Sequence, residues 1–190
     1  MASKVERRID MTSKSRDSSD FIQYIRKLAK LGEPGAQFVF VYYLSSRPNA
    51  SKYRHQCLEV LFRLSKQENS IADYILGNWY THGLGVKKDY KKAFKYFLSA
   101  AQKGHPSAQY DVGVSFEKGA GTIKNLEKAF KWYRKAALQN DPTGQMELGL
   151  CYFHGVGIAR NIKKAIFWYR KAAKNGNLEA IHTLAALHKT

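Results

Sequence analysis

Six histidines and two cysteines are the side chains in this sequence that are best suited to bind a metal ion. Their spacing argues against such a site. His182 and His188 are six positions apart, whereas two ligands on one face of a helix stand four apart. His82 and His154 occupy equivalent positions in a repeated pattern, with a whole copy between them, too far apart to share an ion at bond lengths of about 2 Å. We therefore expect no metal site.

The sequence also lacks a recognisable pair of nucleophile and base, and it has no glycine-rich phosphate loop after a strand. Cys57 and Cys151 lie in different copies of the pattern. We expect both to be free thiols in small core positions, which agrees with a reducing compartment. The prediction is a protein that is not an enzyme, with no catalytic residue, no cofactor and no small-molecule substrate.

Basic side chains are the remaining groups suited to bind a ligand or partner. The chain has 32 lysines and arginines against 15 acidic residues, a formal net charge of +17, and the charge is spread along the sequence rather than collected in a tail. Such a charge favours an acidic partner protein, nucleic acid or an anionic membrane surface. A solvated basic face without a partner is the alternative.

A 36-residue repeat must position these groups, with regular copies at 72–104, 108–140 and 144–176. Glycines recur at three positions of each copy. A period of this length indicates stacked units that each bury an apolar face on their neighbours. The glycines are Gly77, Gly83 and Gly85, with Gly113, Gly119, Gly121, Gly149, Gly155 and Gly157 at the equivalent positions.

Each copy reads as two helices joined by a Gly-x-Gly turn. The second helix has an N-cap residue in every copy, namely Asp89, Asn125 and Asn161, and ends at a residue that tolerates a left-handed conformation, namely Gly104, Asn140 and Gly176. A glycine inside the first helix costs about 1 kcal/mol relative to alanine, so we expect the neighbouring helix to pass too close for a Cβ there. The aromatic pairs of the second helix, such as Trp132 with Tyr133, are expected to pack between units as core.

Weaker copies extend the pattern in both directions. We expect a disordered polar tail at 1–16 and one continuous array over 17–190. The array comprises a lone helix at 17–32, a degenerate repeat at 36–68, the three regular repeats and a capping helix at 178–190. The fold class is therefore all-α, an α/α superhelical solenoid of stacked antiparallel helix pairs.

The columns A-x-x-x-L-G-x-x-Y-x-x-G-x-G and D/N-x-x-K-A-x-x-W-Y-x-K-A-A-x-x-G resemble the Sel-1-like repeat, a relative of the tetratricopeptide repeat. The resemblance is specific over 72–176 and weak over 21–68 and 178–190. It implies an adaptor or scaffold without catalytic residues, as in eukaryotic membrane-associated complexes and in bacterial signalling and host-interaction proteins. Cysteine pairs that staple the repeats in one secreted branch are missing from this chain.

Two candidate binding surfaces follow. The first is a basic edge near the start of the second helices, where a positive side chain is unfavourable for the helix dipole by about 0.3 to 1 kcal/mol; it comprises Lys88, Lys92, Lys124, Lys128, Arg160 and Lys164. Lysines at positions 92, 128 and 164 also belong to the family pattern, so they can be inherited with the fold. The second surface is a groove lined by variable positions of the first helices, namely Asn78, Trp79, His82, Asp111, Ser115, Glu147 and Cys151.

Trp79 is the strongest single anchor in the groove because interface hot spots favour tryptophan; packing against the degenerate repeat is the alternative. We expect a partner protein or peptide, acidic in character, with nucleic acid or an anionic membrane as the rival. No apolar run is long enough to cross a bilayer and the N-terminus has no signal-peptide core. The expected location is the cytoplasm, and export by a signal-independent route, as for a bacterial effector, stays open.

Overall fold

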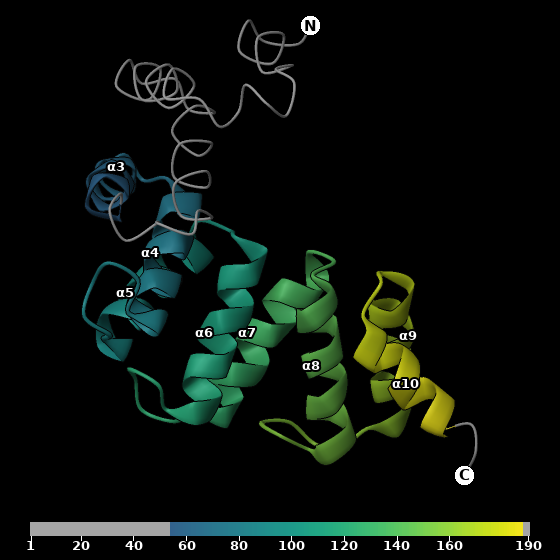
Figure 1. Cartoon of the computed structure of the whole chain (residues 1–190). Helices are drawn as coiled ribbons and strands as arrows, with labels where there is room; N and C mark the ends of the chain where they lie inside the picture. The colour runs from purple at the N-terminus through teal and green to yellow at the C-terminus, as the bar shows by residue number, and fades with distance from the viewer. Residues whose placement is uncertain (1–53, 188–190) are drawn as a thin grey trace, which may run out of the picture. The chain divides into compact units, whose positions relative to one another are not determined.

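The computed structural model describes residues 54–187, and within them it contains eight α-helices and no strand (Figure 1). The chain divides into two units, 1–67 and 68–190; α3 belongs to the first unit and the other seven helices to the second. The helices are α3 (Arg54–Lys66), α4 (Ser70–His82), α5 (Tyr90–Gln102), α6 (Pro106–Lys118), α7 (Leu126–Leu138), α8 (Pro142–His154), α9 (Ile162–Lys174) and α10 (Leu178–Leu187). This confirms the predicted all-α repeat solenoid.

The helix bounds follow the sequence period. Each of α5, α7 and α9 begins 36 residues after the preceding second helix, and α3 begins 36 residues before α5. The predicted second helix of the degenerate repeat is therefore present as α3. The predicted tail at 1–16, the lone helix at 17–32, the start of the degenerate repeat and residues 188–190 lie outside the described part, so one continuous array over 17–190 stays a prediction.

Successive helices of the second unit pack against one another from α4 to α10, and the helix pairs follow one another across Figure 1 from α4 and α5 to α9 and α10. First helices of neighbouring repeats also meet directly, because α6 contacts α8. No pair of second helices in this unit approaches to the same extent. We call the side formed by the first helices, where the groove was predicted, the inner side of the array.

The turn between the two helices of a repeat uses the signals read from the sequence. Gly119 caps α6 in a left-handed conformation with φ of 72°. The side chain of Asn125 then accepts the backbone N–H of Lys128 at 2.8 Å and so caps α7. Its own backbone N–H donates to the carbonyl of Phe116 at 2.8 Å, which closes the turn. The same bonds recur in the other two repeats at Asp89 and Asn161.

The second glycine of the turn serves contact between repeats. A Cβ on Gly121 would run into the backbone carbonyl of Tyr90, at the start of the preceding second helix, and a Cβ on Gly157 would meet that of Leu126 in the same way. Only glycine lets these two backbones touch, and its φ of 73° at position 121 is a further demand for it. The Gly-x-Gly motif therefore combines a helix cap with a stacking contact.

The glycine inside each first helix makes room for an aromatic ring. A Cβ on Gly113 would lie 2.5 Å from the ring of Tyr133, and Gly149 stands in the same relation to Tyr169. The predicted crowding is confirmed, but the partner is a side chain of the same repeat. Our expectation that these rings pack between units was wrong, because the missing Cβ leaves a slot inside the repeat that the ring fills.

Other side chains join one repeat to the next. Phe94 of α5 meets Phe116 of α6 edge to face at 5.3 Å, and Phe130 meets Tyr152 in the same way at 5.5 Å. Beneath them, buried Gln109 donates to the carbonyl of Ala101 across the repeat boundary. These contacts belong to one buried core that extends from α4 to α8.

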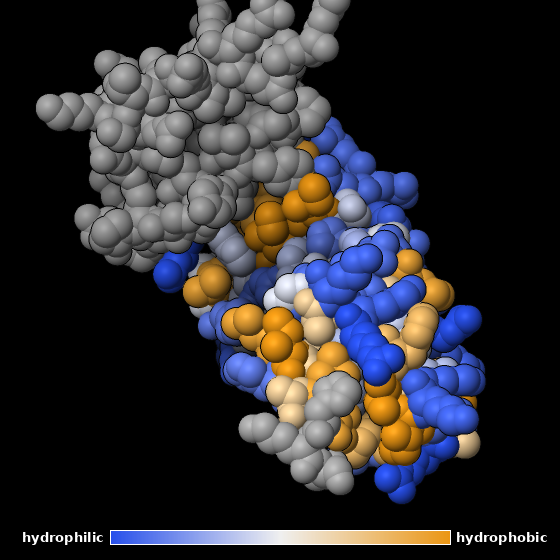
Figure 2. All heavy atoms as spheres, turned by 90° about the vertical axis from the view of Figure 1, so that its right-hand side faces the viewer, coloured by the Kyte–Doolittle hydropathy of each residue, from blue (hydrophilic) through white to orange (hydrophobic). Residues whose placement is uncertain are grey.

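The array ends on an apolar face. Figure 2 looks onto the end that carries α9 and α10 and shows apolar side chains gathered there. Leu178 is 70% exposed, and Phe167 and Ile181 are also exposed.

No helix among residues 54–187 is both long and apolar enough to span a membrane.

Candidate functional site

Four of the predicted groove residues share one cavity. A space of about 300 Å³ lies among α4, α5 and α6, with an apolar floor that includes Phe94 and Phe97. Its polar lining carries amide, hydroxyl, imidazole, carboxyl and ammonium groups. The predicted groove residues that line it are Asn78, His82, Asp111 and Ser115. The structure therefore brings together side chains from two repeats on the inner side of the array.

Three predicted groove residues present little side-chain surface. Trp79 is 4% exposed and Cys151 3% exposed. Ser115 is 7% exposed, and its hydroxyl donates to the backbone carbonyl of Asp111 at 2.8 Å. The choice of Trp79 as an anchor is not supported, because a side chain buried in the fold is not free to enter a partner. Fewer of the predicted groove residues are accessible than the sequence led us to expect.

Glu147 lies on α8 at the position equivalent to that of Asp111 on α6. Burial raises the pKa of Asp111 to about 7, with a further contribution from Asp141. Burial also raises the pKa of Glu147 to about 7, assisted by Glu117 and Glu179 and opposed by Lys118. Neither carboxyl belongs to a salt bridge within residues 54–187. The inner side of the array thus holds carboxyl groups that burial and like charge make hard to ionise.

Sequence reasoning placed Glu117 on the first-helix face but missed Glu179 as a member of this acidic surface. The available signal was the distribution of charge between the two kinds of helix. Every first helix of the second unit carries a carboxylate, whereas α5 and α9 contain no acidic residue and four or more basic residues stand on α7 and on α9. The array is therefore acidic along its first helices and basic along its second helices.

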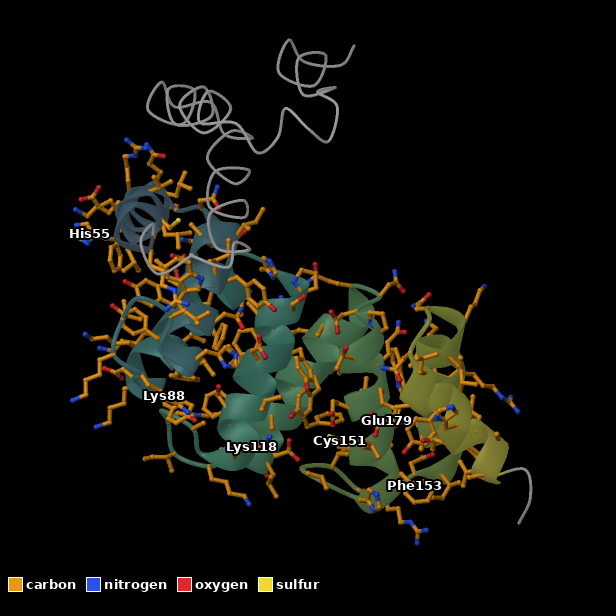
Figure 3. All side chains as sticks on the ribbon, viewed as in Figure 1. His55, Lys88, Lys118, Cys151, Phe153 and Glu179 are labelled. Carbon is orange, nitrogen blue, oxygen red and sulfur yellow. The ribbon has the colours of Figure 1, made fainter. Side chains whose placement is uncertain are left out.

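All six residues of the predicted basic edge are exposed. None of them takes part in a salt bridge within the described residues. Figure 3 labels one of them, Lys88, in the loop that precedes α5. The edge therefore offers positive charges that the fold itself leaves without an acidic partner.

The two columns of the edge differ in what they contact. The lysines that belong to the family pattern each lie above an aromatic ring of the first helix in the same repeat. The distances from ammonium to ring centroid are 5.4 Å for Lys92 over Tyr80, 5.4 Å for Lys128 over Phe116 and 5.3 Å for Lys164 over Tyr152. A cation over a ring contributes about 0.5 to 1 kcal/mol at an exposed site, which gives this column a role in the fold.

Two members of the other column contact residues at helix ends instead. Arg160 donates from Nε to the carbonyl of Phe153 at 3.0 Å, and its guanidinium lies 5.9 Å from that ring. The ammonium of Lys88 lies 4.8 Å from the ring of Tyr90, itself 46% exposed. These contacts hold the charges at the rim without neutralising them.

The described residues offer no support for a metal site or a reactive thiol. No group of three or more metal-binding side chains comes together within 54–187. Cys57 and Cys151 are buried free thiols, as predicted. Burial raises the pKa of Cys57 to about 11 and that of Cys151 to about 12, so both are protonated and poor nucleophiles near neutral pH.

Comparison with protein families assigns the repeats. The model of the Sel1 repeat matches residues 70–105, 106–141 and 142–177. Each match begins at the first residue of a first helix. A comparison with curated proteins finds no match.

Solved structures share the architecture. A protective antigen of uropathogenic Escherichia coli strains, which displays an SLR fold, is 33% identical with a TM-score of 0.81 over 87% of this chain and 36% of its own. A Sel1 repeat protein from Oxalobacter formigenes is 41% identical with a TM-score of 0.65 over 70% of this chain and 54% of its own. Cysteine rich protein B of Helicobacter pylori, at 22% identity and a TM-score of 0.56, covers 73% of this chain and 98% of its own and shows the fold alone. The chain spans about a third and about half of the first two relatives.

Proposed function

Because this chain belongs to the Sel1 repeat family, we propose that it is a non-enzymatic scaffold that binds a partner protein through its groove and its basic edge. Sel1 repeat proteins are in general protein interaction scaffolds. Both of the more similar relatives are bacterial proteins, and we propose a bacterial adaptor, including one that acts on a host.

One observation carries the proposal for the basic edge. Lys88, Lys124 and Arg160 stand at equivalent positions, one per repeat, and all three are exposed without an acidic partner in the described part of the chain. Three charges at one-repeat spacing suit an extended acidic segment that follows the array. We propose an acidic protein segment as the ligand of this edge.

Charge reversal tests the edge. The variant carries Lys88→Glu, Lys124→Glu and Arg160→Glu, and the matched control carries glutamate at Lys95, Lys131 and Lys174, which are exposed on the second helices. Both variants change the net charge equally. The probes are a glutamate-rich peptide, duplex DNA and vesicles containing phosphatidylserine.

We expect wild type and control to bind the glutamate-rich peptide and the edge variant to lose at least about ten-fold in affinity. Equal binding by all three proteins would refute the basic edge. Preference for DNA, with an affinity that falls steeply and linearly on a log-log plot against salt, would favour the nucleic-acid alternative. Preference for the vesicles would favour an anionic membrane.

A further inference from the structure

The groove side of the array carries a row of carboxylates. Asp111 and Glu117 belong to α6, Glu147 to α8 and Glu179 to α10. Mutual repulsion among them is evident, because Glu117 and Glu179 both raise the pKa of Glu147 after burial itself. Only the exposed Lys118 opposes them. We call these four residues the acidic row.

A buried hydroxyl without a partner lies beside the acidic row. The ring of Tyr133 crosses α6 at Gly113, and its hydroxyl donates to Oε2 of Glu117 at 2.7 Å. One repeat later, the ring of Tyr169 crosses α8 at Gly149 in the same way. Its hydroxyl is fully buried and has no hydrogen-bond partner among the described residues. Burying such a group without a partner costs about 1 to 3 kcal/mol.

The missing partner results from one substitution within the repeat. Phe153 occupies the position on α8 that Glu117 occupies on α6, and its ring centroid lies 6.4 Å from that of Tyr169. Both tyrosine rings cross the first helix at the same column, so both hydroxyls reach the groove side. Met146 and Ala180, the chain neighbours of Glu147 and Glu179, pack in one buried cluster with Tyr169. After burial and Cys151, the two carboxyls also raise the pKa of Tyr169. Figure 3 shows Cys151 and Phe153 on α8 and Glu179 on α10.

We propose that the acidic row binds an extended basic segment of a partner protein, with one lysine or arginine side chain held by Glu147, Glu179 and the hydroxyl oxygen of Tyr169. A cationic group carries only donors, and these three groups supply acceptors. It reaches the hydroxyl by displacing the half-buried Phe153 ring. The cavity beside Asp111 takes another side chain of the same segment one repeat away.

This inference rests on the proposed function as a scaffold but uses other residues and the opposite charge; Arg160 of the basic edge contacts Phe153 beside the proposed site. The net charge of +17 repels a cationic peptide from the molecule as a whole. Binding of such a peptide therefore reports local attraction by the acidic row rather than a general electrostatic effect. The chain then joins an acidic segment at its edge to a basic segment in its groove.

The experiment measures fluorescence anisotropy of a labelled peptide of alternating lysine and alanine, about twelve residues long, against the full chain at about 0.15 M salt. The test variant is Asp111→Asn with Glu147→Gln. The matched control is Glu59→Gln with Glu127→Gln, because both residues are exposed and lie outside the row. Asparagine and glutamine keep the side-chain shape and remove a buried charge, so the test variant remains folded.

We expect wild type and control to bind the lysine peptide and the test variant to lose at least about ten-fold in affinity. The variant Tyr169→Phe should weaken binding several-fold, since it removes one acceptor. Equal binding by wild type and the test variant, or preference for a glutamate–alanine peptide at this surface, would overturn the proposal. An unchanged affinity in Tyr169→Phe would remove Tyr169 from the site.

The two proposals fail separately. The edge variant with Lys88, Lys124 and Arg160 reversed should still bind the lysine peptide, and the groove variant should still bind the glutamate-rich peptide. Failure of the wild type to bind only the lysine peptide contradicts the acidic row, and failure of the wild type to bind only the glutamate-rich peptide contradicts the basic edge.

Discussion

The ammonium nitrogen of Lys103 lies 2.8 Å from Oδ2 of Asp73, at the positions where the next two repeats pair amide side chains. Asp73 is 1% exposed and also accepts a bond from the hydroxyl of Ser99 at 2.7 Å. In the following repeats Gln139 donates to Gln109 at 2.8 Å and Asn175 to Gln145 at 2.9 Å. The same two positions of the repeat therefore hold an ion pair in one copy and an amide pair in the next two.

Removal of one partner of this pair should be costly. We expect Lys103→Gln to lower the free energy of unfolding by about 2 to 3 kcal/mol, because it leaves a buried carboxylate without its cation. Adding Asp73→Gln recreates the amide pair of the next repeat and should restore more than half of the loss. Urea denaturation of both single variants and the double variant measures the coupling. Additive losses would contradict the pairing.

The two glycines of one turn should differ in their response to alanine. Gly119 and Gly121 have φ values of 72° and 73°, so alanine is strained at both by about 1 to 2 kcal/mol. At Gly119 the nearest atoms lie 3.5 Å from the added Cβ, whereas at Gly121 the Cβ meets the backbone of Tyr90. Gly121→Ala should therefore cost at least about 1 to 3 kcal/mol more. Equal shifts in thermal midpoint would refute the stacking role.

Two equivalent tyrosines should respond in opposite directions to loss of the hydroxyl. Tyr133→Phe removes a hydrogen bond to Glu117 and should destabilise the fold by about 1 kcal/mol. Tyr169→Phe removes a buried hydroxyl that has no partner among the described residues and should be neutral or stabilising by up to about 1 kcal/mol. Denaturant midpoints of the free protein measure both. A loss at Tyr169 as large as that at Tyr133 would contradict the difference between the repeats.

The acidic row should make the fold less stable as pH rises. The pKa values of Asp111 and Glu147 are about 7 in the folded chain and about 4 in an unfolded one. Since the folded state holds these protons longer, their stabilising contribution is complete below about pH 4 and is lost as pH rises through about 7.

Asp111→Asn with Glu147→Gln should remove this part of the pH dependence. Relative to wild type, the variant should gain on the order of 1 kcal/mol per site between about pH 5 and pH 8, a value reduced by solvent screening of these half-buried groups. Urea midpoints at the two pH values measure the gain. Burial is the main cause of both raised pKa values, and the charges that modify them are Asp141 for Asp111 and Glu117, Glu179 and Lys118 for Glu147. A constant difference between variant and wild type would be contrary to this assignment.

The sequence by itself determined the period, the helix pairs and their ends. Asn125 and Gly119 act on the backbone within three or four residues of themselves, so their roles as caps follow from residue type and spacing. Exposure of the basic edge was equally predictable, because Lys88, Lys124 and Arg160 stand in or beside turns.

Only the tertiary structure decided which side chains are free. Trp79 differs from its neighbours in the sequence and invites a role in binding, yet it is buried. Lys92 and Lys88 look alike in the sequence, but only Lys92 lies above a ring of the first helix. The unpaired hydroxyl of Tyr169 depends on Phe153, sixteen positions earlier in the chain. Capping residues and turn glycines determine the backbone locally. Contact between helices determines which side chains are buried and which polar groups find a partner. Binding depends on the polar groups and charges that remain without one.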